Sequence, residues 1–123
     1  MPGWGAVQHA YRNALDELAD NKPDNAITDA ATALQDALTL LGCDGNTLGP
    51  LVHSARTKGL LAPHNSTLAT GSGKFMQWAS ADRSELGDGH HGASLAERDD
   101  AWLCVYVVGA LILRLSRGFR PRS

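Results

Sequence analysis

The chain has few cysteines and no long apolar run, and each shortage excludes a class of protein. Its 123 residues include two cysteines, Cys43 and Cys104. Two thiols do not make the disulfide framework of a small secreted domain, so we expect a reducing, cytoplasmic location. The N-terminal segment becomes charged too early for a signal peptide. The most apolar run, 101–113, is shorter than the roughly 20 residues of a bilayer span, so no membrane partner is expected.

The sequence also lacks the alternation of apolar and polar residues that is typical of half-buried strands. Helices are expected instead in five segments, which are 4–19, 25–42, 47–59, 74–80 and 94–116. The predicted fold class is all-α, a small bundle of four or five helices with long connections on one side. At this length we expect one domain, over residues 1–117, followed by a basic C-terminal tail over 118–123.

Two of these helices are strongly apolar. The second carries an apolar stripe at helical spacing, formed by Ile27, Ala30, Ala31, Leu34, Ala37, Leu38 and Leu41. We expect Asp24 to cap this helix and Gly42 to end it, and Thr47 to cap the next one. The last helix is apolar nearly all round in its second half, so the sequence predicts that it is buried on most sides, with Cys104 in the core.

The charge of the chain is unevenly distributed. The formal net charge is −2, yet the last ten residues hold four of the 11 basic side chains and no acid. These four are Arg114, Arg117, Arg120 and Arg122. The remaining residues form an acidic body. Arginines beside a cleft would neutralise the phosphates of RNA, and a solvated tail is the alternative interpretation.

The segment RSELGDGHHG, 83–92, carries an arginine, two acids and two histidines among three glycines. Its ligand atoms suggest a metal site at Glu85, Asp88, His90 and His91, but adjacent histidines point apart and no cysteine is near. Upstream, GSGK at 71–74 resembles a phosphate-binding loop. It lacks the required glycine at position 68 and the required Ser or Thr at position 75. We therefore expect neither a phosphate loop nor a metal, and no cofactor.

Arg83 and His90 are the remaining candidates for chemistry. The planar fork of an arginine fits a phosphodiester, and a histidine transfers protons near neutral pH. A cationic group and a proton-transfer group are the two kinds of side chain that RNA cleavage without a metal requires. Such cleavage deprotonates a 2′-hydroxyl, places positive charge on the phosphorane and protonates the leaving 5′-oxygen. The residues alone leave two alternatives open: an ion pair of Arg83 with Asp82 or Asp88, and a His90 that caps the last helix.

RSELGDGHHG, followed by the apolar helix AWLCVYVVGALILRL, resembles the C-terminal domain of bacterial abortive-infection proteins, a branch of the all-helical HEPN superfamily. In that branch the segment runs Arg-Asn, a few residues, Gly-Asp-x-His-Gly, and then the final helix. The matching residues are Arg83, Gly87, Asp88 and His90. The extra His91 shifts the last glycine to position 92. AITDAATALQDALTLLG and NTLGPLVHSARTKGLL also resemble that family's earlier helix and its Thr-Leu-Gly-x-Leu connection, so the resemblance covers roughly 25–115.

The resemblance implies a HEPN-like helical bundle and a homodimeric, metal-independent endoribonuclease of phage defence or a toxin–antitoxin system. It implies that Arg83 holds the scissile phosphate and that His90 is the general acid and base, with support from Ser84, Asp88 and His91. Ser84 departs from the family's usual asparagine. RNA is the expected partner, and an antitoxin or defence-system protein is a further one. Some family members only bind RNA or assemble, so a non-catalytic RNA-binding or dimerisation module is the alternative.

Overall fold

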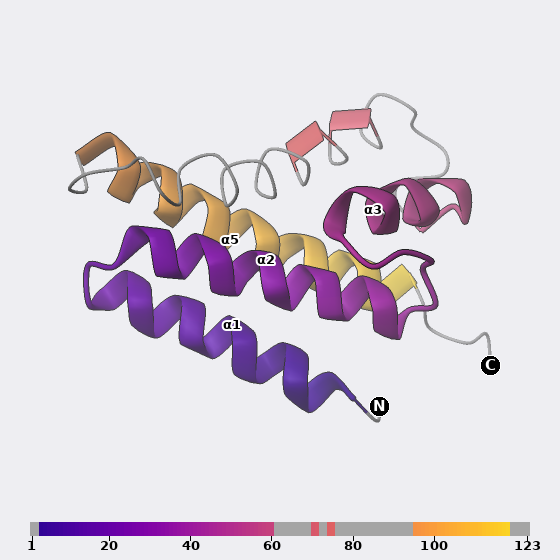
Figure 1. Cartoon of the computed structure of the whole chain (residues 1–123), viewed down its shortest axis with the longest axis horizontal. Coiled ribbons are helices and arrows are strands. Elements are labelled where there is room, and N and C mark those ends of the chain that lie inside the picture. The colour runs from indigo at the N-terminus through magenta and orange to yellow at the C-terminus, as the bar shows by residue number, and fades with distance from the viewer. Residues whose placement is uncertain (1–2, 61–69, 72–73, 76–94, 119–123) are drawn as a thin grey trace.

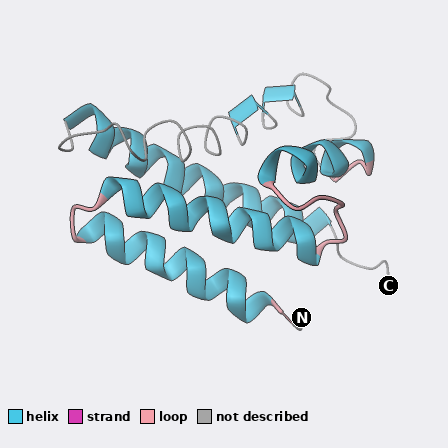
Figure 2. Ribbon diagram, in the orientation of Figure 1, coloured by secondary structure: helices cyan, strands magenta, loops and turns pink. Residues whose placement is uncertain are grey.

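The computed structural model describes residues 3–60, 70–71, 74–75 and 95–118, with side chains in the last range described from Arg98 to Ser116. These residues form four helices, which are α1 (Trp4–Ala19), α2 (Pro23–Leu40), α3 (Leu48–Thr57) and α5 (Leu95–Gly118). No strand occurs in the described ranges, so the prediction of a small all-α bundle is confirmed (Figure 2). Residues 74 and 75 are helical too, and the rest of the helix predicted over 74–80 lies outside the description.

Helix α2 lies at the centre of the bundle and packs against α1, α3 and α5 (Figure 1). It runs antiparallel to α1 and in the same direction as α5. The start of α5 therefore lies at the end of the bundle where α1 turns into α2. The start of α1 and the end of α5 lie at the opposite end of the bundle.

The predicted apolar stripe of α2 is buried in full, including Leu41 just past its end. Alanine dominates the buried surface of this helix, and small side chains let the neighbouring helices approach closely. The large side chains that complete the core come from three helices and include Leu34, Leu38, Leu51, Val52, Val105, Val108 and Leu115. Burying a side chain of this size stabilises the fold by about 1.5–3 kcal/mol. Cys43 and Cys104 are both buried, as expected for Cys104, and neither forms a disulfide.

The helices begin and end close to the predicted positions, but the predicted side-chain caps are not formed. The prediction that Asp24 caps α2 is wrong, because the helix already begins at Pro23, after Lys22. Proline suits the first helical position, where its missing N–H loses no hydrogen bond. Asp24 lies in the first turn instead, where a carboxylate complements the helix dipole. Thr47 does occupy the N-cap position of α3, but its side chain makes no capping hydrogen bond.

The prediction that the last helix is buried on most sides is wrong for the described residues. Helix α5 packs against α2 and α1. Away from them it exposes large apolar side chains, with exposed fractions of 56% for Trp102, 49% for Leu103, 49% for Tyr106 and 54% for Leu113. No helix among the described residues, α5 included, is long and apolar enough to cross a membrane.

Candidate functional site

The predicted catalytic segment lies outside the described residues, and this applies to Arg83, Ser84, Asp88, His90 and His91. Helix α5 begins at Leu95, five positions after His90 in the sequence. The order of motif and final helix is thus the one that the resemblance requires. The roles of Arg83 and His90 stay predictions.

Of the four arginines predicted to contact nucleic acid, Arg114 is described. It is exposed near the end of α5, next to the buried Leu115. Arg117 belongs to α5, with its side chain outside the description, and Arg120 and Arg122 lie beyond the described residues. Cations in the last turns of a helix complement the partial negative charge of its terminal carbonyl groups. Arg114 is therefore available to a ligand in solution, and the contribution of the other three stays a prediction.

Helix α5 carries apolar residues on two opposite faces. One face packs into the core through Cys104, Val108 and Leu115. The other, which we name the α5 seam, consists of Leu103, Tyr106, Ala110 and Leu113, all of them exposed. These four positions are spaced by three, four and three residues, the repeat that aligns apolar side chains along one helix for packing against another. The seam has the pattern of a helix-pairing surface.

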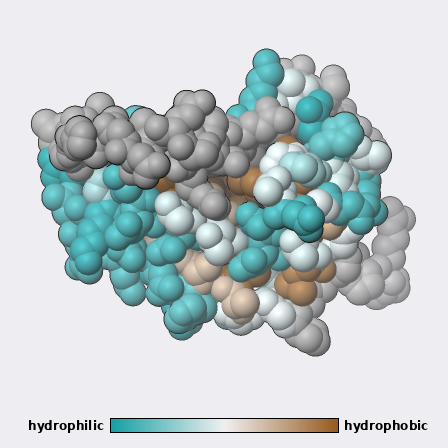
Figure 3. All heavy atoms as spheres, viewed as in Figure 1, coloured by the Kyte–Doolittle hydropathy of each residue, from teal (hydrophilic) through white to brown (hydrophobic). Residues whose placement is uncertain are grey.

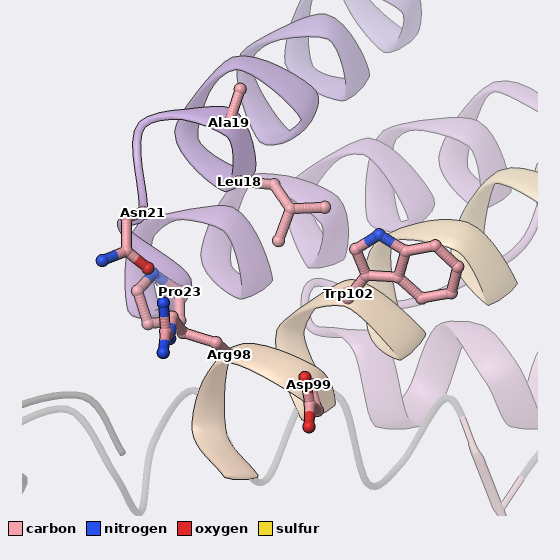
Figure 4. Close-up of a pocket in the computed structure, with 7 residues that line it drawn as sticks. All are labelled: Leu18, Ala19, Asn21, Pro23, Arg98, Asp99 and Trp102. Atoms are coloured by element: carbon pink, nitrogen blue, oxygen red, sulfur yellow. The ribbon is translucent and has the colours of Figure 1, made fainter. Parts of the chain in front are cut away.

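A pocket of about 550 Å³ opens where the start of α5 meets the turn between α1 and α2 (Figure 4). Its lining consists of Leu18, Ala19, Asn21, Pro23, Arg98, Asp99 and Trp102. Leu18 points towards Trp102, and Arg98 lies beside Pro23 and Asn21 (Figure 4). The volume falls within the range of small-ligand sites. The pocket therefore combines an apolar wall with a few polar groups.

The indole of Trp102 packs against the ring of Tyr106, which belongs to the same helix. Its ring centroid lies 4.4 Å from that of Tyr106, one helical turn later, and the two ring planes are tilted by 40°. Tilted aromatic pairs at this separation attract each other beyond simple area burial. Tyr106 in turn belongs to the α5 seam, so the pocket and the seam share one aromatic pair.

The end of the bundle that holds the pocket is acidic. Residues 16–24 carry four carboxylates against Lys22, and residues 98–100 carry two against Arg98. On the adjoining helices, burial raises the pKa of Asp29, and the nearby carboxylate of Glu17 raises it further. The amide of Asn25 donates a hydrogen bond of 3.3 Å to Glu17. Hydrophilic side chains also gather over this end in Figure 3. An anion approaching the pocket is repelled by this field, and a cation is attracted.

The described residues offer little else for catalysis. They contain no group of three or more His, Cys, Asp or Glu side chains that would hold a metal ion. Burial raises the pKa of the Cys43 thiol, and this outweighs the opposing hydrogen bond with Ser54. A buried, protonated thiol is a poor nucleophile.

The described elements define a small all-α bundle with an exposed apolar seam on α5 and a pocket at its acidic end. No family model matches the chain, and no curated protein or solved structure shows significant similarity to it. The likeness to the HEPN superfamily accordingly rests on the residues quoted above, and we treat it as a proposal.

Neither the seam nor the pocket was predicted from the sequence. The three-four-three spacing of the seam is visible in the sequence, but a helix that is apolar all round conceals which of its faces is covered. The pocket has no comparable signal, because its lining comes from two segments far apart in the chain, 18–23 and 98–102. Only folding brings Leu18 and Trp102 to the same place.

Proposed function

We propose that the chain is a metal-independent endoribonuclease of the HEPN type, acting as a cytoplasmic homodimer in phage defence or in a toxin–antitoxin system. The observation that carries the proposal is the presence of Arg83 and His90, with six residues between them, in the segment directly before the last helix of a chain whose described part is all helical. Gly87 and Asp88 complete the resemblance to the abortive-infection pattern.

The proposed reaction is an internal transesterification of RNA. The 2′-hydroxyl loses its proton to a histidine, and its oxygen forms a new bond to phosphorus while the bond to the 5′-oxygen breaks. The leaving 5′-oxygen gains a proton, so the products are a 2′,3′-cyclic phosphate and a 5′-hydroxyl. His90 serves as general acid and base, a role typically worth 10²- to 10⁴-fold in rate. Arg83 holds the phosphate and stabilises its developing charge.

Two described features support this proposal. The α5 seam exposes Leu103 and Tyr106 on the helix that follows the motif, and parallel pairing of this helix between two copies would place the two starts of α5 at the same end of a dimer. Arg114, on the same helix, is exposed near its basic end and free to approach RNA phosphates.

The test is RNA cleavage in the presence of EDTA, comparing the wild type with Arg83→Ala and His90→Ala. We expect the wild type to cleave and each variant to lose at least about 10²-fold in rate, because each removes a group needed in the transition state. A 2′,3′-cyclic phosphate should be detected at the new 3′ end by mass spectrometry.

Matched controls are His9→Ala and Arg12→Ala, which remove an exposed histidine and an exposed arginine from α1. Both should cleave like the wild type. His91→Ala separates the roles of the two adjacent histidines. The proposal fails if the wild type cleaves no RNA under any condition, or if both motif variants cleave undiminished.

The second candidate function is a non-catalytic module for RNA binding or dimerisation. The α5 seam favours it, since a helix-pairing surface serves assembly whether or not the chain turns over. The acidic end of the bundle also favours it, because that end repels RNA. Measuring RNA binding by the cleavage-null His90→Ala protein at several salt concentrations separates binding from catalysis.

A further inference from the structure

The ribonuclease proposal does not use the pocket at the acidic end of the bundle. This pocket lies at the start of α5, whereas Arg114 lies near the end of that helix. Arg114 follows Trp102 by 12 positions on the same helix, about 18 Å along its axis, so Arg114 is not part of the pocket.

We propose that this pocket binds a basic peptide segment of a partner protein, with an arginine side chain of that segment stacked on Trp102. The indole is 56% exposed and is backed by Tyr106 at 4.4 Å, so it offers a face on a supported ring. An aromatic face attracts a cation, and the planar guanidinium group of arginine stacks on it better than a lysine ammonium group does.

Charge complementarity selects this occupant over an RNA. The pocket lining holds one cation and one anion, Arg98 and Asp99. The flanking residues are predominantly acidic, with Asp16, Glu17, Asp20, Asp24 and Asp100 against Lys22. A polyanion is repelled by this surface, whereas a segment with several arginines is attracted to it. No carboxylate among the described residues forms an ion pair with Arg98.

The apolar part of the lining fits the same ligand. Leu18, Pro23 and Trp102 contribute apolar surface against which the methylene stem of an arginine packs while its head meets acids at the rim. A volume of about 550 Å³ exceeds the need of one side chain and accommodates part of a peptide backbone as well. The side-chain amide of Asn21 supplies a donor and an acceptor for that backbone.

A second copy of this chain could also supply a basic segment, but the resulting contact would not form a closed assembly. Its basic end would dock on the acidic end of the next copy, a head-to-tail contact that leaves both outer ends open and continues into filaments. A separate partner protein forms a closed complex. We therefore propose a separate protein as the source of the basic segment. Sedimentation tests whether a second copy of this chain occupies the pocket instead.

The experiment titrates the whole chain with an acetylated and amidated hexa-arginine peptide and, in parallel, with hexa-lysine at 50 mM salt. Binding is measured by calorimetry, and its location by the chemical shift of the Trp102 indole N–H. We expect hexa-arginine to bind about two- to five-fold tighter than hexa-lysine. Trp102→Leu should remove this difference, whereas Trp102→Phe should keep part of it.

Charge variants give the sharper test. Asp99→Asn should weaken hexa-arginine binding about two- to three-fold, and the matched control Asp44→Asn, at the far end of the bundle, should leave it unchanged. Arg98→Gln should tighten binding, because it removes the one cation of the lining. For a phosphate-binding pocket the same substitution would weaken binding of a single-stranded oligonucleotide.

Three results would overturn the proposal. One is equal binding of the two peptides that Trp102→Leu does not change. Another is an oligonucleotide that shifts the Trp102 signal and loses affinity on Arg98→Gln. The third is self-association in sedimentation that Trp102→Leu abolishes, because it would identify a second copy as the occupant. None of these readouts depends on RNA cleavage, so this inference and the ribonuclease proposal can fail separately.

Discussion

Tyr11 and Gly109 show how one residue pair sets the spacing of two helices. The hydroxyl of Tyr11 on α1 donates a 2.9 Å hydrogen bond to the backbone carbonyl of Val105 on α5. The ring passes directly over Gly109, where a Cβ atom would clash with the Tyr11 hydroxyl and come within 2.7 Å of its Cζ atom. Glycine is therefore needed here for close approach, although its backbone is an ordinary helix.

Gly109→Ala is expected to destabilise the protein, even though alanine is the better helix former by about 1 kcal/mol. Overpacking against Tyr11 costs about 1–3 kcal/mol, so the net loss should reach up to about 2 kcal/mol. Urea unfolding followed by circular dichroism measures it.

In a Tyr11→Leu background the steric obstacle is gone, and Gly109→Ala should become neutral or stabilising. This reversal distinguishes the specific contact from a general intolerance of α5. If alanine is equally harmful in both backgrounds, Tyr11 is not the cause.

At the scale of the element, α5 is a helix with one apolar face buried in the core and another exposed to solvent. Its inner face contributes Val105, Val108 and Leu115 to the core. Its outer face, the α5 seam, keeps Leu103, Tyr106 and Leu113 in contact with solvent. Large contiguous apolar patches are rare on the surface of monomeric proteins, and they mark interaction sites.

Under the proposed pairing of α5, Leu103→Glu is expected to shift the protein from dimer to monomer, because it places a carboxylate on the paired surface at the first position of the α5 seam. Stability of the isolated chain should change by less than about 0.5 kcal/mol, since the side chain is exposed. Sedimentation velocity over a range of concentrations measures the association.

Ala6→Glu, on the exposed side of α1, adds the same charge away from the seam and serves as its control. If both variants stay dimeric, or if the wild type is a monomer at every concentration, the α5 seam does not pair. If Leu103→Glu also abolishes RNA cleavage while Ala6→Glu does not, the two sites act together.

At the scale of the whole molecule, charge is separated along the axis of the bundle. The acidic side chains around the α1–α2 turn lie at one end, and Arg114 lies near the other. The chain end with the remaining arginines follows Arg114 in sequence. If the chain binds RNA as proposed, this separation favours contact of the polyanion with the basic end of the bundle.

Replacing Arg114, Arg117, Arg120 and Arg122 together with glutamine should weaken RNA binding and its dependence on salt. Each arginine that contacts a phosphate contributes about 0.7 to the slope of log K against log salt for single strands, so the slope should fall by up to about 3. Fluorescence anisotropy with the His90→Ala protein measures this without cleavage.

Arg12→Gln, on α1, removes a cation elsewhere and should leave the slope unchanged. An unchanged slope in the fourfold variant would instead identify the basic end as a solvated tail.

Much of the fold follows from local sequence, because helix periodicity and helix termination are encoded within a few neighbouring residues. The stripe from Ile27 to Leu41 was identified in full, since every member lies on one face of one helix. Gly42 ended the helix as expected, with a φ of 89° that favours glycine. The cap at Asp24 was misassigned, because Pro23 competes for the same start and fits the first helical position better.

The sequence by itself determined the helical class, the buried stripe of α2 and the order in which Arg83, His90 and the last helix follow one another. Tertiary structure decided which face of α5 is covered and that Leu18 and Trp102 line one pocket. The physical reason is range: helix formation depends on residues three or four positions apart. Burial and pocket formation instead depend on which distant helices pack together. The sequence around an apolar residue does not indicate which helix it packs against.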